Sequence, residues 1–342
     1  MSTVLVVGGA GYVGSHAVKA LAAAGYDVVV YDNLLAGHRE AVARIAGAFP
    51  ARSVALVDGD ILDGPRLSET LVRSGASAVM HFAALLSVGE STRAPLAYYR
   101  TNVTGTLAVL GAMAEAGVTP FVFSSTAATF GEPERIPIDE SHPQRPINAY
   151  GETKLAVERA LPHLERAHGI RSVVLRYFNA AGADPAGLIG EHHDPEEHLI
   201  PRAFGAVLGG PPLTVFGTDY PTPDGTCVRD YVHVSDLADA HLSALKRLES
   251  GGASGAFNLG NGAGVTVRQV LDAVGRATGQ LVPQTVGPRR PGDPARLVAS
   301  NEAAQRELGW RPRLGDLQAI VDTAWRWHRT HPKGYAGARL PE

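Results

Sequence analysis

The chain has 342 residues, of which 45% are hydrophobic and 19% are charged, and its formal net charge at pH 7 is −3. This balance is typical of a globular protein and gives no electrostatic reason to expect nucleic acid or a membrane surface as a partner. The single cysteine, Cys227, excludes a disulfide framework, and no apolar stretch approaches the ~18 residues of a membrane span. We therefore expect a soluble cytoplasmic protein.

The first elements predict a dinucleotide site. An apolar strand at 3–7 runs directly into the glycine-rich stretch 8–14, and an alanine-rich helix follows. Strand, glycine turn and helix in this order are the context in which a glycine motif binds a dinucleotide. The spacing is G-x-x-G-x-x-G. Gly8 would make the turn, Gly11 would let the backbone approach the pyrophosphate, and Gly14 would let helix and strand pack closely.

The second predicted strand, 27–31, ends at Asp32, about 20 residues beyond the glycines. A carboxylate in this place can bind both ribose hydroxyls and repel a 2′-phosphate, which favours NAD over NADP. The alternative is that Asp32 is only a turn residue at a strand end. His38 and Arg39 lie close enough in sequence to keep NADP in consideration.

The continued alternation of apolar strands and helices along the chain predicts a doubly wound parallel α/β sheet of the Rossmann type. After Asn179 the chain becomes richer in loops, which predicts a smaller mixed α/β substrate domain. We expect domains at 1–178 and 179–342, with segments near 230–260 returning to the first. In the first domain the predicted strands are 53–57, 78–82, 121–123 and 172–175, and the predicted helices are 67–73, 95–116 and 149–168, the last kinked or split at Pro162. In the second they are strands 213–216 and 256–259 and helices 199–208, 234–247, 267–278, 301–308 and 316–329, with Ser235, Thr266 and Ser300 as caps.

Tyr150 and Lys154 are the strongest candidates for catalysis. Four residues apart on a predicted helix, their side chains leave one face and can meet. A free tyrosine has a pKa near ~10, and one cation at about 4 Å supplies roughly the 4 kcal/mol needed to bring it near 7. The sequence therefore predicts a tyrosine base that Lys154 makes acidic. The alternative is an ordinary surface pair on a helix.

These motifs, together with 123–126 (FSST) and 176–179 (RYFN), resemble the extended short-chain dehydrogenase/reductases. Within that superfamily the chain is similar to the UDP-glucose 4-epimerase family over nearly its whole length, and the block 219–234 outside the cofactor domain makes the resemblance specific. The resemblance implies reversible epimerisation at carbon 4 of UDP-glucose and UDP-galactose, tightly bound NAD, a UDP-hexose substrate and a homodimer. It implies that helices 95–116 and 149–168 form the dimer contact.

The resemblance also implies a set of roles. Tyr150 would be the base, Lys154 would hold the nicotinamide ribose, and Thr126 would bind the sugar oxygen, although it could be only a strand-end cap. The NAD site would comprise Gly8, Gly11, Tyr12, Val13, Gly14, Asp32, Asn33, Asp60, Ile61, Phe82, Ala83, Ala84, Lys154 and Phe178. Asn179, Arg229 and Arg290 would hold the diphosphate and Asp293 the uridine ribose, while His198, Leu199 and the strand from Thr214 to Phe216 would border the nucleotide.

Three positions depart from the family pattern. Leu86 replaces a lysine that some members place near the cofactor, and Thr101 stands where some have an asparagine. Leu297 occupies the position that gates N-acetylated sugars. A large aromatic side chain there excludes the acetamido group and a small one admits it. Leucine is intermediate, so UDP-N-acetylglucosamine and UDP-N-acetylgalactosamine remain possible substrates.

Other interpretations fit the residues less well. A nucleotide-sugar dehydratase needs an acid/base pair, typically Asp-Glu after the threonine, where this chain has Ala127 and Ala128. A decarboxylase is less excluded, and a non-catalytic dinucleotide sensor would not need the tyrosine and lysine. Arg229 could instead pair with Asp230, and Arg290 with Asp293, as surface ion pairs. We expect no metal, because His192, His193, His198, Asp194 and Glu196 lie in a loop without a tight ligand spacing.

Overall fold

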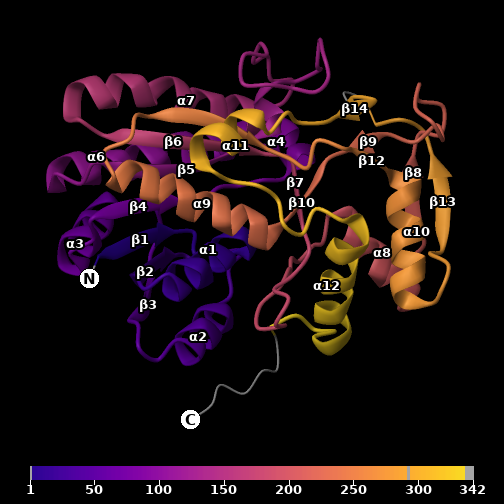
Figure 1. The fold of residues 1–342 in the computed structure, drawn as a ribbon, viewed down its shortest axis with the longest axis horizontal. Coiled ribbons are helices and arrows are strands. Elements are labelled where there is room, and N and C mark those ends of the chain that lie inside the picture. The colour runs from indigo at the N-terminus through magenta and orange to yellow at the C-terminus, as the bar shows by residue number, and fades with distance from the viewer. Residues whose placement is uncertain (1, 291–292, 336–342) are drawn as a thin grey trace.

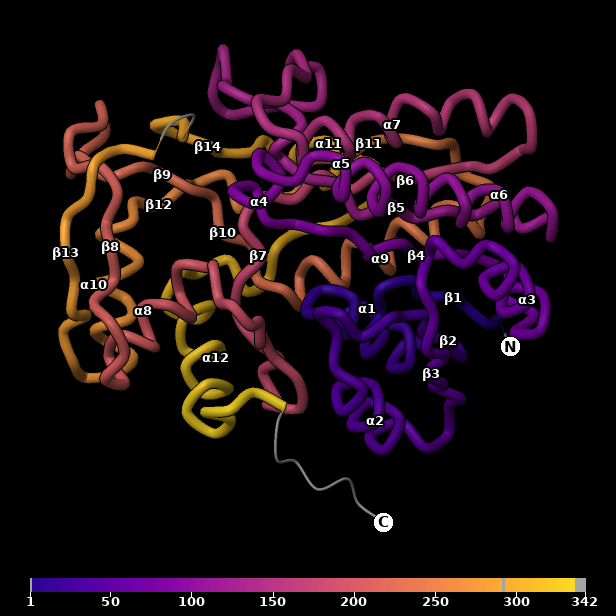
Figure 2. Tube along the Cα trace, turned by 180° about the vertical axis from the view of Figure 1, so that it is seen from behind, coloured from indigo at the N-terminus to yellow at the C-terminus, as the bar shows by residue number. Residues whose placement is uncertain are grey.

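The computed structural model describes residues 2–290 and 293–335. A parallel sheet of seven strands, in the order β11-β6-β5-β4-β1-β2-β3, forms its centre (Figures 1 and 2). The order reverses between β1 and β4, which confirms the predicted doubly wound dinucleotide-binding fold. The strands are β1 (Thr3–Val7), β2 (Asp27–Asp32), β3 (Val54–Asp58), β4 (Ala78–His81), β5 (Pro120–Thr126), β6 (Arg171–Tyr177) and β11 (Gly255–Leu259).

Helices cover both faces of this sheet, because alternate residues of each strand point to opposite sides. Val4 and Val6 of β1 belong to the core under α1, α2 and α9, whereas Leu5 and Val7 belong to the core under α3, α6 and α7. The helices are α1 (Tyr12–Ala23), α2 (Arg39–Ala48), α3 (Gly64–Ser74), α6 (Thr106–Ala116), α7 (Ala149–His168) and α9 (Val234–Glu249). None of the helices in the described part of the chain is long and apolar enough to cross a membrane.

The segment 95–116, predicted as one helix, contains a π-helical stretch. After α4 (Val88–Arg93), α5 (Pro95–Tyr98) passes into the π-helix η1 (Tyr99–Gly105), and α6 follows. Such stretches are frequent at functional sites. Here η1 carries Asn102, which is buried and whose amide group bonds the N–H and C=O of Leu85 at 2.8 and 3.0 Å and the hydroxyl group of Thr153 at 3.1 Å. The π-helix therefore ties the loop after β4 to α7.

Two predictions, a split of α7 and one of the helix caps, are wrong. Pro162 does not split α7, which is one helix of 20 residues, and a kink at Pro162 stays a prediction. Val157 and Leu161 pack into the same core, and that packing on the buried face outweighs the missing hydrogen bond at Pro162. The cap of α9 is His233, whose Nδ1 accepts the N–H of Ser235 at 3.0 Å, so Ser235 is not the cap.

The predicted caps of the other two helices have different outcomes. Thr266 caps α10 (Val267–Thr278) as predicted, in a capping box with Gln269. Asn301, not Ser300, holds the cap position of α11 (Glu302–Leu308), but the hydroxyl group of Ser300 accepts the N–H of Glu302 at 3.5 Å.

The remaining elements lie beside the sheet, where the chain leaves β6 (Figure 1). Strand β7 (Asn179–Ala181) pairs with β10 (Tyr231–His233), β8 (Leu213–Phe216) with β13 (Gln284–Gly287), and β9 (Val228–Arg229) with both β12 (Val265–Thr266) and β14 (Arg296–Leu297). Helices α8 (Leu199–Val207), α10 and α12 (Leu317–Thr330) enclose a separate core. Residue 178 lies between β6 and β7, and α9 and β11 return to the large sheet.

Candidate active site

The glycine turn after β1 has the shape of an anion cradle. Gly8 has φ +80°, and a Cβ there would lie 2.3 Å from the Ala83 nitrogen. A Cβ on Gly14 would lie 2.2 Å from the Gly8 oxygen, so both positions exclude a side chain. A Cβ on Gly11 would meet only the Gly8 oxygen, at 3.6 Å, which leaves open space above the turn. Helix α1 begins directly there at Tyr12, and its unpaired N–H groups fit a pyrophosphate.

The ends of β2 and β3 fit the adenosine half of a dinucleotide. Asp32 is buried, and its carboxylate accepts the N–H groups of Ala10 and Leu34, each at 2.9 Å. Burial raises the pKa of Asp32, and these two hydrogen bonds oppose the rise. Asn33 donates to the Asp60 carboxylate at 2.9 Å, which brings these two predicted residues together across the strand ends.

The two basic residues that had kept NADP in consideration are held by other partners. Arg39 pairs with Asp58 at 3.3 Å, and the Nε2 atom of His38 lies 3.1 Å from Nδ1 of His192. Both side chains therefore already have partners within the protein. The local geometry thus favours a free ribose, as in NAD.

The loop after β4 faces the glycine turn. The N–H groups of Phe82 and Ala83 both bond the Val7 oxygen, at 2.7 and 3.1 Å, so this loop continues along β1. Ile61 is buried directly against η1, where a Cβ on Gly105 would lie 2.5 Å from it. Two of the three departures from the family pattern, Leu86 and Thr101, lie near this loop, and Leu86 is exposed at 45%. Thr101 lies next to Asn102, which supplies the hydrogen bonds to this loop.

Thr126 and Tyr150 meet where β5 ends and α7 begins. The side chain of Asn148 caps α7 by accepting the N–H of Gly151 at 2.9 Å. A Cβ on Gly151 would lie 2.4 Å from the Ala128 oxygen, so glycine lets the first turn of α7 lie against the 3₁₀ turn η2 (Ala127–Thr129). Thr126 caps η2, accepting the N–H of Ala128 at 3.1 Å, and its hydroxyl group lies close enough to Tyr150 to lower the pKa of that phenol.

Lys154 lies below this pair and is almost fully buried. Its Nζ donates to the Ser124 oxygen at 3.0 Å and lies 4.9 Å from the ring centroid of Phe123. Burial lowers the pKa of Lys154 to about 8, against the opposing charge of Glu158. Burial also raises the pKa of Tyr150 well above its usual value. The neighbouring Thr126 hydroxyl group opposes that rise. The expected lowering of the pKa of Tyr150 by Lys154 stays a prediction for the site with its cofactor bound.

A buried ionic network supports this edge of the sheet. Arg176 of β6 donates to both carboxylate oxygens of Glu158 on α7, at distances from 2.7 to 3.2 Å. Ser125 and Gln144 donate to the same carboxylate. The network locks α7, and with it Tyr150, against β5 and β6. The sequence analysis missed it because Glu158 and Arg176 are 18 residues apart and only the packing of helix on sheet joins them.

The predicted substrate residues lie on the short strands. Arg229 forms an ion pair with Asp293 and also donates to the Pro294 oxygen at 2.9 Å, so the predicted alternative pairing with Asp230 is wrong. Asp230 instead accepts the N–H groups of residues 261, 262 and 299. The guanidinium carbon of Arg290 lies 4.0 Å from the ring centroid of Phe216, not against Asp293.

Two further groups of predicted residues are placed on the same side. Asn179, His198 and Leu199 line one small pocket with Tyr231. Thr214 pairs with Thr285 at 3.4 Å across β8 and β13. Leu297 packs with Phe178 against the small buried cluster of Ala127, Phe130 and Ile138, directly behind Thr126.

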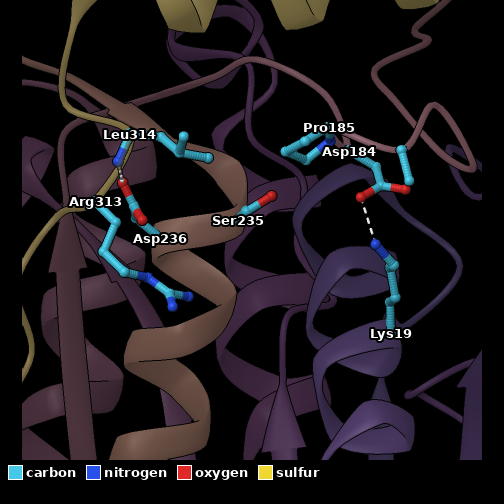
Figure 3. Close-up of a pocket in the computed structure, with 8 residues that line it drawn as sticks. Lys19, Asp184, Pro185, Ser235, Asp236, Arg313 and Leu314 are labelled. Atoms are coloured by element: carbon cyan, nitrogen blue, oxygen red, sulfur yellow. Dashed lines mark hydrogen bonds and ion pairs between the residues drawn. The ribbon is translucent and has the colours of Figure 1, made fainter.

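A larger, open pocket lies elsewhere, between α1, the start of α9 and the loop before α12 (Figure 3). Its charged groups are satisfied within the protein. Lys19 pairs with Asp184, and Asp236 accepts the N–H of Leu314 at 2.9 Å. None of the predicted site residues lines it, so we do not assign the active site there.

Comparison with known proteins agrees with this geometry. The model of the NAD dependent epimerase/dehydratase family matches residues 4–260. The chain belongs to that family. It is 52% identical to a UDP-glucose 4-epimerase of Rhizobium meliloti (strain 1021), over 97% of this chain and 99% of the relative. The resemblance predicted from the sequence is confirmed.

Solved structures of relatives agree as well. A UDP-glucose 4-epimerase from Brucella ovis in complex with NAD is 48% identical, with a TM-score of 0.91 over 96% of this chain and 98% of that one. A UDP-glucose 4-epimerase from Bifidobacterium longum in complex with NAD+ and UDP is 36% identical, with a TM-score of 0.91 over 97% and 100% of the two chains.

Proposed function

We propose that this protein interconverts UDP-glucose and UDP-galactose by epimerisation at carbon 4, with tightly bound NAD as its cofactor. The observation that carries the proposal is the placement of Thr126 at the end of β5, with Tyr150 and Lys154 in the first turns of α7 and the Lys154 ammonium group bonded to β5 at the Ser124 oxygen. The proposal is supported by membership of the NAD dependent epimerase/dehydratase family and by 52% sequence identity to a UDP-glucose 4-epimerase over 97% of the chain. The glycine cradle and Asp32 fit NAD without a competing side chain.

Carbon 4 has no acidic proton, so its inversion requires oxidation to a 4-ketone and reduction from the opposite face. Bound NAD would supply the hydride acceptor and donor for carbon 4, held by the glycine turn and Asp32. Tyr150, as a phenolate, takes the proton of the 4-hydroxyl group and gives it back after the ketosugar has turned. Thr126 holds the same sugar oxygen, and its nearby hydroxyl group lowers the pKa of Tyr150, which favours the phenolate.

Lys154 holds the cofactor in this proposal. An ammonium group has three donors, and the Ser124 oxygen takes one of them. The other two can reach the nicotinamide ribose. Because Tyr150 is the second residue of α7, the positive end of the helix dipole also favours the phenolate, by roughly 0.3–1 kcal/mol.

The short strands grip the nucleotide. We place the diphosphate at Arg229, Arg290 and Asn179, and the uridine ribose at Asp293. Binding would exchange the Arg229–Asp293 pair for charge-assisted bonds to the ligand. His198, Leu199 and the strand from Thr214 to Phe216 border the nucleotide. Firm hold on UDP and loose hold on the sugar allow the ketosugar to turn.

Dehydration is disfavoured at the same site. The two residues after Thr126 that carry the acid/base pair of a dehydratase are Ala127 and Ala128, and both lie in η2 beside Tyr150. A methyl side chain cannot move a proton. A dehydratase would therefore lack its elimination chemistry here.

The assignment is tested by turnover and by removal of the base. Purified protein mixed with UDP-galactose should yield UDP-glucose, without consuming added cofactor. Tyr150→Phe should lower kcat by about 10²–10⁴-fold and leave UDP affinity unchanged. No turnover of UDP-galactose even with NAD+ added would refute the assignment, and a near-normal rate for the Tyr150→Phe enzyme would remove the tyrosine as base.

We further propose a homodimer. Among the described residues, Leu96, Tyr99 and Leu107 are large apolar side chains that are exposed at 84, 44 and 43% along α5, η1 and α6. A second copy covering this face would remove them from water. Light scattering should give twice the chain mass, and Leu96→Asp should shift it toward the monomer. The cytoplasmic location stays a prediction.

A further inference from the structure

A cluster of four side chains forms where the chain enters α8. Glu191, His193, Glu196 and His198 each direct one possible ligand atom to a common point, and these atoms all lie within 4.8 Å of one another. The irregular spacing of these residues did not predict a metal site, and Glu191 lies outside the residues named as candidates from the sequence. The fold of the loop brings the four together.

The charges of this cluster are balanced by one another only. Glu191 is buried, yet the charged partners given for it and for Glu196 among the described residues are the imidazoles of His193 and His198, with no lysine or arginine. A buried carboxylate needs a nearby positive charge to remain ionised. The imidazoles of His193 and His198 supply that charge when both are protonated, and one divalent cation would supply it when both are neutral.

Most of the spacings between the ligand atoms are close to those of a four-coordinate site, and the widest, up to 4.8 Å, would close when the ion binds. Bonds of about 2.0–2.1 Å to a tetrahedral zinc ion place neighbouring ligand atoms about 3.3 Å apart. Nδ1 of His193 lies 3.4 Å from a carboxylate oxygen of Glu191 and 3.5 Å from one of Glu196. Nδ1 of His198 contacts Glu191 and lies 3.9 Å from Glu196. The two rings stand at 88° to each other.

An orphaned atom points to a ligand that is not protein. Nδ1 of His193 is buried and makes no hydrogen bond of acceptable geometry within the described residues, although two carboxylates lie beside it. Buried polar atoms are almost always satisfied. We propose that Glu191, His193, Glu196 and His198 bind one divalent cation, and that the mixed nitrogen and oxygen donor set selects zinc.

The ion would lie beside the substrate pocket and hold its wall in place. His198 also lines the pocket that contains Asn179, and His193 lies edge-on to Tyr12 at the start of α1, with 6.1 Å between ring centroids. The ligands span residues 191–198, so the metal would fix the loop between the glycine turn and the pocket wall. The role is structural and requires no step of the reaction.

Metal content of the full-length protein tests the proposal. Wild type, His193→Ala and Glu196→Gln are incubated with zinc chloride, desalted, and analysed by atomic emission. His192→Ala is the matched control, because the neighbouring His192 bonds His38 and not the cluster. Wild type and the control should retain about one zinc per chain, and each ligand variant should bind zinc at least about 10²-fold more weakly.

Two further readouts decide the outcome independently of activity. Zinc should raise the melting temperature of wild type and of His192→Ala but not of the ligand variants, and cobalt(II) should give the intense visible absorption of a four-coordinate site. If His193→Ala does not fold, Glu196→Gln, which alters a partly exposed side chain, gives the answer. Wild type that retains no more zinc than the ligand variants overturns the site, as does equal loss in His192→Ala.

Discussion

The two ends of the active site are built in opposite ways. The catalytic end lies on long parallel strands and the first turns of α7. Lys154 and Glu158 of α7 and Arg176 of β6 are buried there, and their hydrogen bonds join α7 to β5 and β6. The nucleotide end lies on strands of two to four residues and the loops that follow them. Arg290 is exposed there, and Arg229 is paired with Asp293, which we assign to the ligand.

The difference follows from what each end must do. Proton transfer requires a base fixed to within a fraction of an ångström, which a buried network on a rigid sheet supplies. Nucleotide binding only requires charged side chains that can exchange one partner for another. We therefore expect substitutions at the catalytic end to affect stability and rate, and substitutions at the nucleotide end to affect affinity.

The largest stability effect should come from breaking the buried network. Arg176→Met leaves the Glu158 carboxylate buried without its ion-pair partner, which should lower the free energy of unfolding by about 3–5 kcal/mol. Urea denaturation measures the loss. The exposed pair of Arg73 and Glu69 provides a control, since Arg73→Met should cost less than about 1 kcal/mol. Equal losses in the two variants would contradict the contrast between the two ends.

A pH-dependent effect should appear at Lys154. Its pKa is about 8 in the folded protein against a usual 10.5, so between these values the unfolded chain binds more protons and stability rises with pH. Lys154→Met removes this dependence. From pH 7 to pH 11 the stability of wild type relative to the variant should rise by about 3 kcal/mol. Lys246→Met, at an exposed lysine, should show no such trend, and a flat difference for Lys154→Met would show that the lysine is not desolvated.

At the nucleotide end the expected change is in binding. Arg229→Met should weaken UDP affinity by about 10–100-fold, the loss of hydrogen bonds to a charged group, with the melting temperature nearly unchanged. Calorimetric titration with UDP measures it. Arg313→Met provides the control, because Arg313 lines the remote pocket of Figure 3 and pairs with Asp239. Undiminished affinity in the Arg229 variant would remove the arginine from the diphosphate site.

The smallest effect should be one of selectivity, at the border between the two ends. Leu297 packs with Phe178 behind Thr126. Leu297→Tyr should lower activity toward UDP-N-acetylglucosamine several-fold more than toward UDP-glucose, because the ring fills the space of the acetamido group. Leu297→Met should change neither rate. An equal decline on both sugars would show that position 297 does not gate the acetamido group.

Local signals in the sequence predicted the sheet and the glycine turn well. Apolar runs and glycines that admit no Cβ are properties of short segments, so they are visible without the fold. The π-helix η1 was missed because its shift by one residue per turn leaves the apolar pattern nearly unchanged. The two-residue strands β9, β12 and β14 are too short to carry any alternation.

The pairing of side chains was the least predictable part. Spacing placed Tyr150 and Lys154 on one helix face, but whether the ammonium meets the phenol or the Ser124 oxygen depends on how deeply α7 lies against β5. Asn102 and Glu191 were missed for the same reason, since their partners are set by tertiary packing. Only Gly151, next to the tyrosine, hinted in the sequence at a close approach of the helix.

The path of the chain has a consequence for how the sugar can move. After β6 the backbone leaves the large sheet, comes back in α9 and β11, departs again for β12 to β14, and returns at α11 (Figure 2). The backbone thus crosses between the two sides of the site several times, so the sides cannot swing apart about a single hinge. We therefore expect a bound hexose to invert by turning within the site, without separation of the two sides.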